Sequence, residues 1–221
     1  MKLDAVIFDM DGLLIDSEPF WKEAEHQVFT QKGVRVSPEL AILTAQMTTR
    51  QVTEFWYKEF PWSGASLDDV ENEVIDKVIA LVTEKGQALA GVTETIKMLK
   101  ANGIKIGLAT NSPARVMHSI LAKLKIDQDF DAISSSDEVI NGKPCPEVYQ
   151  LTLSKLGVLA ENVIAFEDSV GGLTASVAAG IKTIAVPENA NYNPDKFEAA
   201  IAILPSLAHF QLTLASEYLV N

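Results

Sequence analysis

The chain has 221 residues, 48% of them hydrophobic, and a formal net charge of −12. This length allows one large domain or a core with a small insert. The negative charge disfavours nucleic acid and anionic membranes as partners, since both need clustered Lys and Arg. No apolar run is long enough to span a bilayer, and no signal peptide is apparent. Cys145 is the single cysteine, so a disulfide within the chain is impossible and we expect a cytoplasmic protein.

The first apolar run, at residues 3–8, ends in two acids, Asp9 and Asp11, with Gly12 after them. Acidic side chains at the carboxyl end of a strand in an α/β sheet commonly carry out chemistry. Residues two apart on an extended chain point the same way, so these carboxylates would repel each other. A divalent cation or a raised pKa would compensate for that repulsion. The alternative is that both acids simply open a turn.

Apolar runs alternate with amphipathic stretches along the rest of the chain. Strands are expected at residues 105–109, 131–134, 162–166, 182–186 and 201–204, and helices at residues 92–102, 114–124, 147–156 and 171–179. This alternation predicts an α/β fold in which a doubly wound parallel sheet is covered by helices on both faces.

Residues 16–87 interrupt the alternation, because they contain no convincing strand. Apolar residues recur at helical spacing, as at Val70, Val74, Val78 and Leu81. We therefore expect an inserted, all-helical cap at 16–87 and a catalytic core made of 1–15 and 88–221. The chain would cross between them near 14–19 and 84–91, and glycines at the second crossing suit a hinge.

Three further polar motifs follow predicted strands or loops. Thr110-Asn111-Ser112 offers a hydroxyl and free backbone N–H groups to a phosphate, although an ordinary helix N-cap would look the same. Lys143 lies between a glycine and two prolines, which restricts its backbone and suits an ammonium that neutralises a phosphate or a carboxylate. Alternatively, it is a solvated loop lysine.

The last motif, Glu167-Asp168-Ser169, precedes Gly171-Gly172 at the start of a predicted helix. Two more carboxylates at a strand end indicate a metal site. An acidic helix N-terminus is the alternative explanation.

Taken together and in this order, the four motifs resemble those of the haloacid dehalogenase-like phosphohydrolase superfamily, in its members with a helical cap. The resemblance implies that Asp9 is the nucleophile, which forms an aspartyl phosphate, and that Asp11 is the general acid and base. It also implies that Thr110 and the backbone near Asn111 hold the phosphoryl oxygens. Lys143 would offset the charge of Asp9 and of the phosphate.

The same resemblance implies a Mg²⁺ site. Asp9, Asp168 and the main-chain carbonyl of Asp11 would bind the ion, with Glu167 joining directly or through water. Mn²⁺ would fit the same oxygen ligands.

The reaction type follows from smaller differences within the family. An acid at position 11 argues against a dehalogenase, whose residue two after the nucleophile is not acidic. β-Phosphoglucomutases usually have a histidine where this chain has Trp21, which favours a phosphatase over a mutase and leaves the mutase as the alternative. A catalytically silent phosphosugar sensor would have a broken motif, and every motif here is intact.

Two features of the predicted cap concern the substrate. Residues 55–64 are unusually aromatic and mostly suit the packing of the cap, whereas Met47-Thr48-Thr49-Arg50 resembles the family's specificity loop. We expect Arg50 and Trp21 to contact the substrate. Together with Asp16-Ser17-Glu18-Pro19, these segments are similar to those of bacterial hexitol phosphatases that also act on 2-deoxyglucose 6-phosphate. The sequence thus predicts a monomeric, Mg²⁺-dependent phosphatase of small sugar phosphates.

Overall fold

A computed structural model describes residues 2–44, 47–187 and 192–215. Its strands are β1 (Ala5–Phe8), β2 (Lys105–Ala109), β3 (Ala132–Ser134), β4 (Val163–Glu167), β5 (Lys182–Ala185) and β6 (Ala202–Ile203). Its α-helices are α1 (Glu18–Gln31), α2 (Pro38–Thr44), α3 (Thr49–Glu59), α4 (Leu67–Lys85), α5 (Val92–Ala101), α6 (Ala114–Leu124), α7 (Glu147–Leu156) and α8 (Val170–Ala178). The strands and helices expected from the apolar pattern are therefore confirmed, with ends that move by one or two residues.

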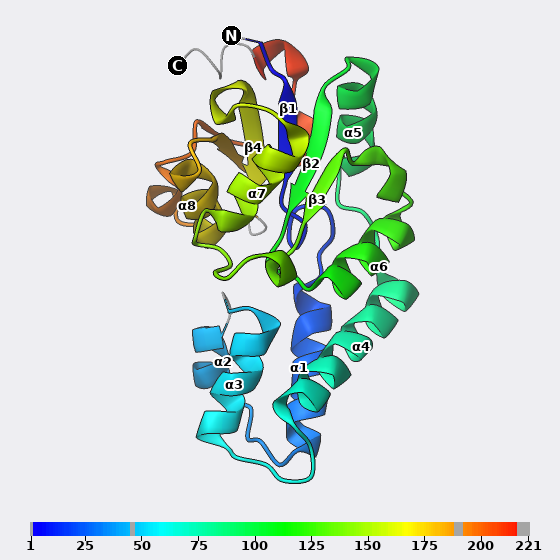
Figure 1. The fold of residues 1–221 in the computed structure, drawn as a ribbon, viewed down its shortest axis with the longest axis vertical. Coiled ribbons are helices and arrows are strands. Elements are labelled where there is room, and N and C mark those ends of the chain that lie inside the picture. The colour runs from blue at the N-terminus through cyan, green and yellow to red at the C-terminus, as the bar shows by residue number, and fades with distance from the viewer. Residues whose placement is uncertain (1, 45–46, 188–191, 216–221) are drawn as a thin grey trace.

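In the described part of the chain, the strands form one parallel sheet in the order β3-β2-β1-β4-β5-β6 (Figure 1). The chain builds outward from β1 in one direction through β2 and β3. It then returns to the other side of β1 with β4 and continues to β5 and β6. A ligand site is expected where the strand order reverses in this way, beyond the carboxyl ends of the strands.

Side chains of β1 alternate between two hydrophobic cores, because successive residues of a strand point to opposite faces. Val6 and Phe8 belong to the core that contains α5 and α6, whereas Ala5 and Ile7 belong to the core that contains α7. Figure 1 shows these helices on opposite faces of the sheet. Burial on both faces explains why β1 reads as a continuous apolar run.

Helices α1 to α4 form a separate helical unit beside the carboxyl edge of the sheet (Figure 1). Val70, Val74, Val78 and Leu81 are buried along one side of α4, as their spacing predicted. Helix α4 packs against α1 and α3 within the unit and against α6 of the core. The guanidinium of Arg115 on α6 lies 2.5 Å from the Asp76 carboxylate on α4, which adds an ion pair between the two parts.

The two crossings between core and helical unit lie side by side. Ile15 forms an antiparallel bridge with Ala88, and the Leu89 N–H donates to the Leu14 carbonyl at 3.0 Å. Gly86 is needed there, since a Cβ at this position would lie 2.6 Å from the Val82 carbonyl oxygen. The division into a core of 1–15 and 88–221 and a cap of 16–87 stays a prediction.

Aromatic side chains fill the centre of the helical unit. Trp56 is almost fully buried, and its ring centroid lies 6.0 Å from that of Phe29 and 5.3 Å from that of Phe55. Trp62 is also buried against Phe29. The expectation that most of the aromatic stretch packs inside the cap is confirmed. No helix among the described residues has the length and apolar character needed to cross a membrane.

The aromatic core leads to a test of stability. Trp56→Ala should lower the free energy of unfolding by about 3–5 kcal/mol, because it leaves a cavity in a packed core. Tyr57→Ala, at a neighbouring residue that is 39% exposed, should cost only about 1 kcal/mol. Urea unfolding followed by fluorescence would measure both values, and equal losses would contradict the packing described here.

Candidate active site

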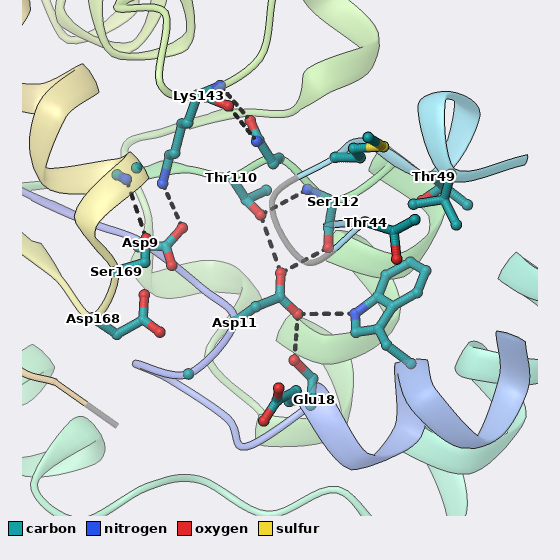
Figure 2. Close-up of a pocket in the computed structure, with 18 of the residues that line it drawn as sticks. Asp9, Asp11, Glu18, Thr44, Thr49, Thr110, Ser112, Lys143, Asp168 and Ser169 are labelled. Atoms are coloured by element: carbon teal, nitrogen blue, oxygen red, sulfur yellow. Dashed lines mark hydrogen bonds and ion pairs between the residues drawn. The ribbon is translucent and has the colours of Figure 1, made fainter. Parts of the chain in front are cut away.

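A pocket of about 330 Å³ lies between the carboxyl edge of the sheet and helices α1 to α3 (Figure 2). From the core it is lined by Asp9, Asp11, Gly12, Thr110, Asn111, Ser112, Lys143, Asp168, Ser169, Gly171 and Gly172. From the helical unit it is lined by Ser17, Glu18, Trp21, Lys22, Glu25, Ala41, Thr44, Met47, Thr49 and Val52. The parallel register explains the first group, because the ends of β1, β2 and β4 meet at this edge.

Lys143 lies at the buried end of the pocket, between two carboxylates. Its Nζ atom lies 2.5 Å from Asp9 Oδ1 and 2.6 Å from Glu167 Oε1, and all three side chains are buried. The Tyr149 hydroxyl donates to the same Glu167 oxygen. These contacts hold one cation against two anions away from water.

The pKa values of this group follow from burial and from the neighbouring charges. Burial raises the pKa of Asp9 to about 7; Lys143 opposes the rise, and the carboxylates of Glu167 and Asp11 add to it. Burial by itself lowers the pKa of Lys143, but the charges of Asp9 and Glu167 outweigh this effect and keep its pKa above the usual value. Lys143 is therefore a permanent cation in the site.

Asp9, Glu167 and Asp168 form an acidic group whose oxygens could hold a metal ion. One oxygen of each lies within 4.8 Å of the others. Glu167 Oε2 is buried and has no hydrogen-bond partner among the described residues. A bound metal ion would satisfy this oxygen. Three carboxylates are hard ligands of the kind that Mg²⁺ and Mn²⁺ prefer. The residues present thus fit a divalent cation.

Two glycines make room for this acidic group. A Cβ at Gly172 would lie 1.9 Å from Glu167 Oε2, and a Cβ at Gly12 would lie 2.2 Å from Asp168 Oδ2. Gly12 also has a φ of +74°, which L side chains rarely adopt. Gly12 and Gly172, each of which follows an acidic motif in the sequence, therefore have a steric reason to be there.

Asp11 lies in a different environment from Asp9, as Figure 2 shows. Ser112 Oγ donates to its carboxylate at 2.7 Å and Thr110 Oγ1 at 3.3 Å. From the helical unit, Trp21 Nε1 donates at 3.3 Å and Ser17 Oγ donates as well. The carboxylate of Asp11 is thus held by uncharged donors from both parts of the protein and is not among the three that form the acidic group.

Asn111 holds the lysine loop. Its side-chain oxygen accepts from the Lys143 N–H at 2.7 Å, and its amide donates to the Lys143 carbonyl at 3.1 Å. Phosphate binding by the backbone near Asn111 stays a prediction. The Asn111 side chain has the additional task of fixing the backbone that presents Lys143.

Two candidate residues are not among those that line the pocket: Glu167, which is fully buried beside Lys143, and Arg50. The Arg50 guanidinium is 2.7 Å from Glu54 and 3.3 Å from Glu71, and it also bonds to Asp68. These carboxylates lie on α3 and α4, away from the pocket lining. Met47 and Thr49, from the same predicted specificity loop, do line the pocket.

Sequence reasoning missed Ser17, Ser112 and Glu25. Both serines lay within quoted motifs, but only the folded chain shows that they meet at Asp11. Glu25 is half-buried and lines the pocket one helical turn after Trp21, a spacing that could have identified it. No hydrogen bond or ion pair reaches its carboxylate from the described residues.

Burial raises the pKa of Glu25 from 4.5 to about 7, so the folded protein binds this proton more tightly than the unfolded chain does. Ionised Glu25 therefore destabilises the fold, and the loss grows as the pH rises from 4.5 to 7. Glu25→Gln should raise the free energy of unfolding by about 2–3 kcal/mol near pH 8 and by little near pH 4. Urea unfolding across this range would measure the difference.

Glu23→Gln is the matched control, because Glu23 lies on the same helix with a side chain 41% exposed. It should change stability little at any pH. A Glu25→Gln benefit that does not depend on pH would contradict the burial argument.

The fold and this site together define an α/β enzyme with an acidic group and a lysine at the carboxyl edge of a parallel sheet. A family model for haloacid dehalogenase-like hydrolases matches residues 6–186, and the chain belongs to this family. The family and the phosphatases described below assign the protein to the phosphoric monoester hydrolases.

Comparisons with known proteins agree with this assignment. Hexitol phosphatase B of Escherichia coli strain K12 is 39% identical over 204 residues, 92% of each chain. A phosphorylated carbohydrates phosphatase of Thermotoga maritima is 34% identical over 182 residues, 82% of this chain and 84% of that one. The solved structure of CbbY from Rhodobacter sphaeroides in complex with phosphate has a TM-score of 0.84 at 25% identity and covers 94% of this chain and 96% of its own.

Proposed function

We propose that this protein is a Mg²⁺-dependent phosphatase of small sugar phosphates that works through a phosphorylated Asp9. One observation carries the proposal: two aspartates from the end of one strand face the same pocket in opposite chemical settings. Asp9 lies against Lys143 and the acidic group, whereas Asp11 lies among hydroxyl and indole donors. Two carboxylates in unlike environments suit the roles of nucleophile and acid–base catalyst.

In the first step, an oxygen of Asp9 attacks phosphorus, an Asp9–phosphorus bond forms and the bond to the leaving oxygen breaks. Asp11 gives its proton to that oxygen, and the alcohol departs. In the second step, Asp11 takes a proton from water, the water oxygen attacks phosphorus, and Asp9 is released with inorganic phosphate. Asp11 thereby regains its proton, so the cycle closes.

Charge neutralisation is the main task of the surrounding residues, because a dianionic ester is repelled by ionised Asp9. Lys143 lies beside Asp9 and offsets part of this charge. Mg²⁺ held by Asp9, Glu167 and Asp168 would supply the remaining positive charge, and Mn²⁺ would fit as well. We further expect the carbonyl of Asp11 to face the ion.

The backbone N–H groups of Asp11 and Asn111 suit the phosphoryl oxygens. Both residues line the pocket, and neither N–H makes a hydrogen bond among the described residues. Donors already directed at the place where charge develops stabilise the transition state. The Thr110 hydroxyl donates its hydrogen to Asp11. To bind phosphate as well, it would have to share this hydrogen between Asp11 and a phosphoryl oxygen.

The substrate class rests on the relatives and on the pocket. The relatives named as phosphatases of hexitols and of phosphorylated carbohydrates cover most of the chain. Trp21 would present its indole to the carbon chain of the substrate while its N–H holds Asp11. We also propose that the protein acts as a monomer in the cytoplasm.

A hexose-phosphate mutase is the alternative. It would keep its first product and return the phosphoryl group to it, so added hexose bisphosphate should stimulate it strongly. A phosphatase should respond little to bisphosphate and should release phosphate continuously. Phosphate release from hexitol and hexose 6-phosphates with Mg²⁺, measured with and without bisphosphate, separates the two functions.

Asp9→Asn tests the nucleophile. The variant should release no phosphate from 2-deoxyglucose 6-phosphate, because an amide is too weak a nucleophile to form the intermediate. Asp127→Asn, on the exposed surface, is the matched control and should keep full activity. Turnover by Asp9→Asn at the rate of the control would exclude Asp9 as the nucleophile.

Asp11→Asn tests the general acid through the leaving group. The variant should be about 10²–10⁴-fold slower than wild type on a sugar phosphate, whose alkoxide needs a proton to depart. The loss should be much smaller on p-nitrophenyl phosphate, whose leaving group is already a stable anion. Initial rates on both esters decide the matter, and equal losses would argue against proton donation by Asp11.

A further inference from the structure

The pocket wall formed by the helical unit carries one carboxylate for which the described residues provide no hydrogen bond or ion pair, that of Glu25. We propose that Glu25 accepts hydrogen bonds from hydroxyl groups of the departing alcohol and thereby selects neutral, hydroxyl-rich phosphate esters over esters that carry a second acid group. This inference rests on the proposed phosphatase function and assigns the specificity of the same site.

The position of Glu25 on α1 supports this role. Trp21, one turn earlier, donates its indole N–H to Asp11 Oδ1 at 3.3 Å. The indole therefore lies beside the carboxylate that serves the leaving oxygen. One turn of helix rises about 5.4 Å, so Glu25 lies on the side of the pocket where the carbon chain of a sugar or hexitol would extend.

The positive charges of the pocket are already engaged elsewhere. Lys22 and Lys143 are the basic residues among those lining the pocket in the described ranges. Lys143 is held by two carboxylates, and Lys22 Nζ lies 2.7 Å from Glu18 Oε1. Neither pairs with Glu25, and each already has a carboxylate partner of its own. A second acid group on the substrate would thus meet Glu25 without compensation.

The rest of this wall suits a polyol. Thr44 and Thr49 are buried hydroxyl residues at the pocket, and Met47 and Val52 supply apolar surface. A sugar or hexitol offers both kinds of group, since its hydroxyls alternate with C–H bonds along the chain. Burial without partners is unfavourable for the ionised Glu25 side chain, as its raised pKa reflects. Hydroxyl groups of a substrate would donate the hydrogen bonds that this carboxylate does not receive from the described residues.

Two substitutions separate hydrogen bonding from charge. Kinetics with Mg²⁺ on sorbitol 6-phosphate, 2-phosphoglycolate and p-nitrophenyl phosphate would be compared for wild type, Glu25→Leu and Glu25→Gln. Glu25→Leu should lower kcat/KM for sorbitol 6-phosphate, relative to p-nitrophenyl phosphate, by about 10- to 100-fold, as expected for a lost bond to a charged acceptor. Glu25→Gln should raise the relative kcat/KM for 2-phosphoglycolate several-fold near pH 8, because it removes a negative charge.

Glu23→Gln is again the matched control, and it should leave both ratios as in wild type, because Glu23 does not line the pocket. Ratios that stay within about twofold of wild type in both Glu25 variants would overturn this inference alone. An equal loss on all three esters would also overturn it, since that result indicates a structural role. A wild-type protein inactive on every ester would overturn the proposed function together with it.

Discussion

The ion pairs that Lys143 makes with Asp9 and Glu167 are the contacts on which the site depends. Asp9 and Glu167 meet because β1 and β4 are neighbours in the sheet, and Lys143 reaches both from a loop whose backbone Asn111 holds. Removing charges from water is costly, and one cation does not fully compensate for two anions. The arrangement therefore calls for further partners: the Tyr149 hydroxyl on one oxygen of Glu167, and a cation for its other oxygen, which is buried without a hydrogen-bond partner among the described residues.

The contrast between the surroundings of Asp9 and Asp11 supports the two different roles that we propose for one short motif. The strand ends at Phe8, and the turn at Gly12 follows at once, so the rule that residues two apart on a strand share an orientation applies only loosely beyond that end. Both aspartates reach the same pocket. Asp9 remains with the buried charges of the core, whereas Asp11 is held by Ser17 and Trp21 of the helical unit as well as by the core.

The contacts of Asp11 link the part of the chain that contains the sheet to the helical unit. A movement of α1 relative to the sheet would change the donors around this carboxylate and, through Trp21, the space left for the substrate. Glu25 lies on the same helix. Because it is a half-buried acid, its ionised form lowers the stability of the fold. Departures from local rules of this kind are expected where a site serves function at some cost in stability.

The alternation of strands and helices, the helical stretch after the first strand and the four polar motifs could all be predicted from the sequence, because apolar periodicity and turn chemistry are local properties. Those motifs were enough to predict Asp9, Asp11, Lys143, Glu167 and Asp168 as candidates. The donors around each carboxylate could not be predicted in this way, and neither could the contacts of Arg50 with Glu54, Asp68 and Glu71 or the position of Glu25 at the pocket. Such partnerships join residues far apart in the chain, and neither spacing nor composition records which side chains meet once the helices pack against the sheet.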